Sequence, residues 1–132
     1  MNRLSVTMLL ALILCLPAWS VQAAVKAQPM AVLISAEWCI NCKLIEPKLA
    51  QLRDAYEGKL RFVSLDVTDD ARLELAQERA EKLGIGDLLQ GEFATGWVAL
   101  FDRHGRKVGE LHQQMSVDEM RKTLNALVAR PG

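Results

Sequence analysis

The sequence has no surplus of basic residues, since sixteen lysines and arginines balance sixteen aspartates and glutamates over 132 residues. A nucleic-acid-binding domain needs such a surplus, so the composition argues against nucleic acid as a partner. Cysteine is also scarce, with three in the chain. The length is enough for one domain with a hydrophobic core, which does not need disulfides in order to fold.

The chain also has no hydrophobic run that is long enough to cross a bilayer. Residues 8–16, MLLALILCL, fall short of the roughly 20 residues that a transmembrane helix requires. This run follows Arg3, ends at Pro17 and precedes the small residues of VQA at 21–23. A short positive region, an apolar stretch and a small-residue site are the pattern of a secretory signal peptide.

We therefore predict a signal peptide over residues 1–23, cleaved after Ala23, and a single domain over residues 24–132. The mature protein would be periplasmic or otherwise secreted, with no stable membrane span. An uncleaved anchor and lipid attachment at Cys15 are the alternatives. Cleavage would leave Cys39 and Cys42 as the only cysteines.

Hydrophobic periodicity predicts an α/β domain in the order β-α-β-α-β-β-α. The strands are expected over 30–35, 60–67, 97–101 and 107–112, and the helices over 40–56, 71–84 and 116–129. Helices between the early strands predict parallel pairing, and the two last strands form an antiparallel hairpin. Ser116 and Glu119 have the spacing of a capping box, which predicts the start of the last helix.

The chemistry of the chain centres on residues 36–43, AEWCINCK. Cys39 is expected just after the first strand, at the N-terminus of the first helix, where the helix dipole favours an anion. The pKa of its thiol should therefore be lowered, which makes Cys39 the attacking sulfur. Cys42 lies one helical turn later and would resolve a mixed disulfide. Lys43 adds positive charge nearby, and Trp38 offers an apolar contact to a partner polypeptide.

Two other uses of the cysteine pair remain open, a metal site and an inert structural disulfide. A zinc site needs about four ligands, whereas the pair supplies two, and the only histidines, His104 and His112, lack a metal-binding spacing. Haem attachment requires a histidine after the second cysteine, where this chain has Lys43. We expect no metal and no cofactor.

The segment AEWCINCKLIEP resembles the active-site segment of the thioredoxin family, in which a strand leads into Trp-Cys-x-x-Cys-Lys and a helix containing proline. Trp38, Cys39, Cys42, Lys43 and Pro47 all fall in register. The predicted order of strands and helices is also similar to that family's fold, without its first strand and helix. The resemblance implies a three-layer α/β/α domain around a mixed sheet of about four strands.

The sequence departs from the family's pattern around the active site. Ile40 and Asn41 separate the cysteines in place of Gly-Pro, so the redox potential cannot be carried over. Leu33 replaces the buried aspartate that assists proton transfer in the family, so a base for the second cysteine must come from elsewhere. Thr95 and Gly96 stand where a cis-proline is expected beside the cysteines, and Gly96 could adopt an unusual backbone geometry in its stead.

The resemblance implies an exported thiol–disulfide oxidoreductase that reduces, or exchanges, disulfides in partner proteins. Cys39 would be the nucleophile and Cys42 the resolving cysteine, with Trp38, Thr95 and Gly96 lining the substrate groove. A membrane electron-donor protein could keep the pair reduced. The alternative is a non-catalytic binding module on the same fold, since a fold does not determine a function.

Overall fold

A computed structural model describes residues 27–131 of the chain. The predicted signal peptide over residues 1–23 lies outside the described residues, and its cleavage stays a prediction. In the described part, no helix is both long and apolar enough to cross a membrane. The elements are β1 (Met30–Ser35), α1 (Ile40–Arg53), the 3-10 turn η1 (Asp54–Tyr56), β2 (Arg61–Asp66), α2 (Asp70–Lys82), the 3-10 turn η2 (Gly86–Leu89), β3 (Trp97–Phe101), β4 (Lys107–His112) and α3 (Val117–Val128).

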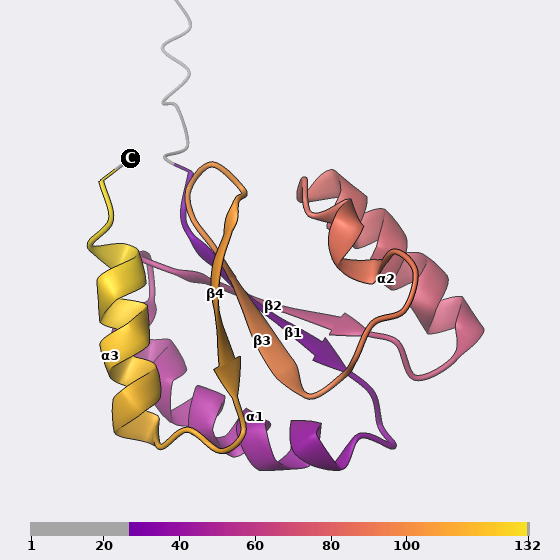
Figure 1. The fold of residues 1–132 in the computed structure, drawn as a ribbon, viewed down its shortest axis with the longest axis horizontal. Coiled ribbons are helices and arrows are strands. Elements are labelled where there is room, and N and C mark those ends of the chain that lie inside the picture. Colours follow the sequence, from indigo (N-terminus) through magenta and orange to yellow (C-terminus); the bar gives the residue numbers. More distant parts are fainter. Residues whose placement is uncertain (1–26, 132) are drawn as a thin grey trace, which may run out of the picture.

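The four strands form one mixed sheet in the order β2-β1-β3-β4. Figure 1 shows α1 and α3 on one face of this sheet and α2 on the other, which is a three-layer α/β/α arrangement. The predicted fold class and element order are confirmed. Each predicted helix and strand is present, with ends that differ by no more than a few residues.

One prediction of strand direction was wrong. Parallel pairing holds for β1 and β2, but β3 runs antiparallel to β1. The reason lies in residues 83–96, which follow α2 and return the chain to the end of the sheet where β1 finishes. There the backbone N–H of Gly96 donates a hydrogen bond to the carbonyl oxygen of Ile34 at 2.9 Å. The strand β3 therefore starts where β1 stops and runs the opposite way.

The core has two halves, one on each face of the sheet. Every residue of β1 is buried, as expected for a central strand, and its side chains alternate between the halves. Leu33 packs with the buried residues of α1 and α3, whereas Val32 and Ile34 pack with those of α2. Both cysteines of the AEWCINCK segment belong to the α2 half.

The helix starts follow from side-chain caps. The Asp69 carboxylate accepts the N–H of Arg72 at the start of α2. The Ser116 hydroxyl and the Glu119 carboxylate each accept a backbone N–H of the other residue, so the capping box of α3 is confirmed. Such a cap satisfies backbone donors that the helix itself leaves unpaired.

The turn between β3 and β4 depends on a buried carboxylate. Burial of Asp102 opposes its ionisation, but hydrogen bonds from the Arg106 backbone and guanidinium and from the His104 N–H outweigh that effect. The pKa of Asp102 therefore lies below its ordinary value. The turn holds β4 in register with β3 and so supports the strand that begins at the cysteine end of the sheet.

Replacing Asp102 by asparagine should lower the free energy of unfolding at neutral pH, because an amide cannot accept these charge-assisted hydrogen bonds equally well. A depressed folded-state pKa stabilises the fold above the unfolded value of about 3.9, and this contribution is lost as the pH falls through the folded-state pKa. Denaturant unfolding from pH 7 to acid should show the gap between wild type and variant closing below about pH 4. Asp54→Asn, at an exposed carboxylate, is the matched control and should change little. A gap that widens on acidification would contradict the assignment.

Candidate active site

The two cysteines sit at the junction of β1 and α1. Cys39 and Cys42 form a disulfide with their Cα atoms 5.3 Å apart. The end of β1 and the N-terminus of α1 hold them, because the chain turns directly from one element into the other over residues 36–39. The spacing of two residues thus brings the two sulfurs together at the start of α1.

Cys39 is the N-cap of α1. Its backbone is extended, with φ of −83° and ψ of 110°, and its Sγ accepts the N–H of Cys42 at 3.2 Å. An N–H donor and the positive end of the helix dipole both favour negative charge on this sulfur. The Sγ of Cys42 lies deeper, 3.6 Å from the carbonyl oxygen of Ile34. Cys42 is also less exposed than Cys39, with exposed fractions of 2% and 5%.

Gly96 lies directly against the pair. Its φ is +83°, and a Cβ at this position would overlap the Cβ of Asn41 and lie 3.0 Å from the Sγ of Cys39. Its N–H also bonds Ile34, which a proline could not do because proline has no amide hydrogen. Gly96 therefore lies beside the cysteines in a backbone conformation that favours glycine.

A cleft of about 390 Å³ opens on the Gly96 side of the pair. Its walls include Asn41, Thr95 and Gly96, and it continues to His112 at the end of β4. The Nε2 of His112 lies 3.0 Å from an oxygen of Glu110, which also pairs with Lys107. The hydrogen bond from Lys107, with that from His112, lowers the pKa of Glu110 against the effect of burial. The cleft therefore has a polar, charged outer wall.

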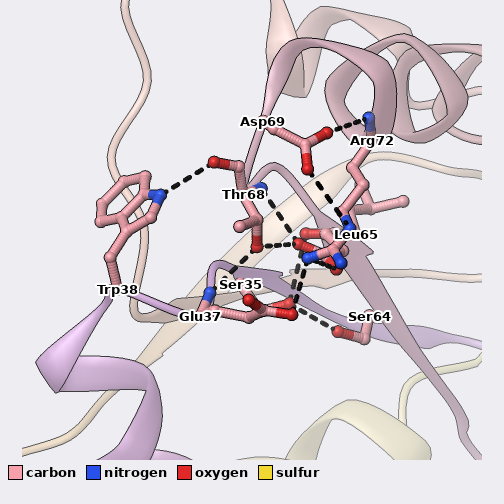
Figure 2. Close-up of polar contacts among 9 residues, drawn as sticks. Ser35, Glu37, Trp38, Ser64, Leu65, Thr68, Asp69 and Arg72 are labelled. Carbon is pink, nitrogen blue, oxygen red and sulfur yellow. Dashed lines mark hydrogen bonds and ion pairs between the residues drawn. The ribbon is translucent and has the colours of Figure 1, made fainter.

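On the other side, Trp38 is tied to the loop between β2 and α2. Figure 2 shows its indole N–H pointing at the carbonyl oxygen of Thr68, at 3.0 Å. The backbone N–H of Glu37 donates to the hydroxyl of the same Thr68, also at 3.0 Å. Trp38 remains 62% exposed, so one face of the ring is available to a partner. The two residues before Cys39 are thus positioned by one threonine.

An ion-pair network around Arg72 lies beside this threonine (Figure 2). The Thr68 hydroxyl donates to Asp66 at 2.5 Å, and this bond, aided by the Thr68 N–H and by Arg72, keeps the pKa of Asp66 below its usual value despite partial burial. The Arg72 guanidinium lies 2.7 Å from Glu37 and 3.5 Å from both Asp66 and Asp69. Glu37 and Asp66 therefore lie beside the same arginine.

A second cavity, of about 320 Å³, reaches the buried cysteine. Cys42 and Lys43 line it, together with three acidic residues, Glu37, Glu46 and Asp66. Lys43 is exposed to solvent. Leu33, which takes the place of the family's aspartate, packs on the opposite face of the sheet, so it contributes no polar group here.

Sequence reasoning did not single out Glu46, Thr68 or Arg72. Glu46 could have been found from its spacing, because residues four apart lie on the same face of a helix and Glu46 follows Cys42 by four. Thr68 and Arg72 lie 29 and 33 positions beyond Cys39, and no local pattern connects them to it.

In the described residues, no three His, Cys, Asp or Glu side chains gather as metal ligands, and His104 and His112 are both exposed.

Comparison with known proteins gives one consistent result. The family model described as thioredoxin matches residues 14–80. Thioredoxin C-2 of Corynebacterium nephridii is 45% identical over 40 residues, which are 30% of this chain and 37% of that protein. The match thus spans little more than a third of the curated relative.

Two solved structures share the fold. Oxidised thioredoxin O2 from Arabidopsis thaliana has a TM-score of 0.52 at 20% identity, covering 77% of this chain and 76% of that one. The thioredoxin of Fasciola hepatica has a TM-score of 0.51 at 20% identity, covering 80% and 86%. At this identity the likeness concerns the fold.

Replacing Gly96 by alanine should destabilise the oxidised protein more than Gly58→Ala does. Both glycines have positive φ, which costs an L-residue on the order of 1 kcal/mol, but only Gly96 would also overlap Asn41 and crowd Cys39. Gly58 has open space around it. Denaturant unfolding of both variants measures the difference, which we expect to exceed about 1 kcal/mol because overpacking adds to the backbone strain. Equal losses of unfolding free energy in the two variants would show that Asn41 and Cys39 move away from the added methyl group at no cost.

Proposed function

Since the chain belongs to the thioredoxin family, we propose that it is a thiol–disulfide oxidoreductase acting through Cys39 and Cys42. The observation that carries this proposal is the position of Cys39 as N-cap of α1, with the N–H of Cys42 on its sulfur. That arrangement stabilises the thiolate that attacks, and it keeps the second sulfur within bonding distance.

The exchange takes place in two steps. The Cys39 thiolate attacks one sulfur of a partner's disulfide, forming a mixed disulfide and releasing the other partner sulfur as a thiolate. Cys42 then loses its proton and attacks the Sγ of Cys39, which closes the Cys39–Cys42 bond and releases the second partner sulfur. Two electrons pass from the dithiol to the partner, and the reverse sequence would oxidise a partner dithiol.

The surroundings of the pair suit a polypeptide partner. Trp38 lies on one side of Cys39 and Ile40 follows Cys39 in the chain, and these large apolar side chains remain 62% and 72% exposed. Thr95 and Gly96 border the cleft on the other side. An extended segment lying between these surfaces would bring its disulfide to Cys39, and we assign Trp38, Thr95 and Gly96 to that groove. Lys43 is assigned to tuning the charge at the pair.

We further propose that the protein works outside the cytoplasm and reduces, or exchanges, disulfides there. The signal-peptide pattern of residues 1–23 supports export, into a compartment where disulfides persist. The resemblance of the Trp-Cys-x-x-Cys segment to that of exported reductant-type domains supports the reducing direction. A reductant in such a compartment needs a supply of electrons, and we propose a membrane electron-donor protein as one partner that could provide them.

A Cys42→Ala variant should accumulate mixed disulfides with partner proteins through Cys39, because the resolving thiol is missing. Non-reducing electrophoresis of the exported protein, followed by identification of the adducts, measures this trapping. The matched control is Cys39→Ala, which retains Cys42 alone and should trap far less. If Cys42→Ala captures nothing covalently, the chain is a binding module and the catalytic proposal fails.

Because a reductant must have a low potential, the proposed direction predicts that the reduction potential of the Cys39–Cys42 pair in the mature chain lies nearer to thioredoxin's, about −270 mV, than to that of a strong periplasmic oxidant, about −120 mV. Equilibration with thiol buffers and quantitation of free thiol gives the value. A potential near the second figure would reverse the proposed direction of electron flow.

A further inference from the structure

The second step of the exchange requires a group that takes a proton from Cys42. A neutral thiol has a pKa of about 8.5, so at neutral pH it attacks well only if its proton is removed as the new bond forms. Leu33 cannot do this, because its side chain is apolar and lies on the far face of the sheet. The acceptor must therefore reach Cys42 by another route.

The cavity beside Cys42 supplies three carboxylates, but two of them are already engaged. Glu37 is bonded to the Arg72 guanidinium at 2.7 Å. Asp66 accepts hydrogen bonds from both the hydroxyl and the N–H of Thr68, and Arg72 lies 3.5 Å away. Donors that stabilise a carboxylate make it a weaker base, and the pKa of Asp66 is lowered for this reason.

Glu46 is the remaining carboxylate of this cavity. It follows Cys42 by one turn of α1, so the two side chains lie on the same face of the helix, and both residues line the cavity. Among the residues that the structure describes, Glu46 takes part in no ion pair. It is exposed to solvent, so water can enter beside it and the proton can leave again after each turnover.

We propose that Glu46 is the proton acceptor for Cys42, an assignment that rests on the proposed function. As the Cys42 sulfur forms its bond to the Sγ of Cys39, its proton passes to the Glu46 carboxylate, directly or through one water. The bond between Cys39 and the partner's sulfur breaks, and the partner leaves as a thiolate. In the reverse direction, protonated Glu46 returns the proton to Cys42 as the Cys39–Cys42 bond opens.

The two steps can be separated by reacting the reduced mature protein with DTNB in a stopped-flow instrument. Attack by Cys39 releases one coloured thiolate at a rate that depends on reagent concentration. Attack by Cys42 then releases the second at a rate that does not. Glu46→Gln should slow the second phase by about a hundredfold, the low end of the range of general base catalysis, and leave the first phase unchanged. Glu46→Asp should recover part of the lost rate.

Glu37→Gln and Asp66→Asn are the matched controls, since they neutralise the other two carboxylates of the same cavity. We expect each to change the second phase less than Glu46→Gln does. A solvent deuterium isotope effect on the second phase of wild type that shrinks in Glu46→Gln would support proton transfer, because a purely structural role would not alter it. Loss of the second phase in Asp66→Asn alone would overturn the assignment in favour of Asp66.

Failure of this inference is distinct from failure of the proposed function. If wild type releases both coloured thiolates and Glu46→Gln does so at the same two rates, the pair is redox-active and Glu46 is not its proton acceptor. If wild type itself releases one thiolate or none, the Cys39–Cys42 pair does not cycle, and both proposals fall together.

Discussion

The active site depends on one contact, the hydrogen bond from the N–H of Cys42 to the Sγ of Cys39 at the first turn of α1. This bond starts the helix and stabilises negative charge on the sulfur at the same time. The bond can form only if the backbone of Cys39 has a fixed position. The strand β1 fixes it, because all six residues of β1 are buried in the centre of the sheet. A central strand that ends in a helix cap thus places this sulfur where negative charge is favoured.

Contacts on both sides of the cysteine pair hold this arrangement. Gly96 joins β3 to the end of β1 through Ile34, and it leaves no room for a side chain against Cys39 and Asn41. On the opposite side, Thr68 binds the two residues before Cys39. The pair is therefore fixed by backbone and threonine contacts, in a site where the family's usual proline is absent.

The acidic side chains near the cysteines lie at other positions than in the family's pattern. The position six residues before Cys39 holds a leucine that packs with α1 and α3, so that half of the core contains no acid there. Three carboxylates line a cavity at Cys42 on the other half, and Arg72 engages two of them. A proton route through Glu46 would use a solvent-open cavity in place of a buried acid.

Local patterns in the sequence determined most of the fold. The apolar run of β1, the period of the helices and the Ser116–Glu119 cap depend on neighbours along the chain, so their positions could be predicted. The spacing of Cys39 and Cys42 likewise indicated the disulfide. Tertiary structure alone decided the antiparallel direction of β3, the ties from Thr68 and Arg72, and which carboxylates reach Cys42. These depend on where distant segments meet in space, and periodicity along a chain carries no information about that.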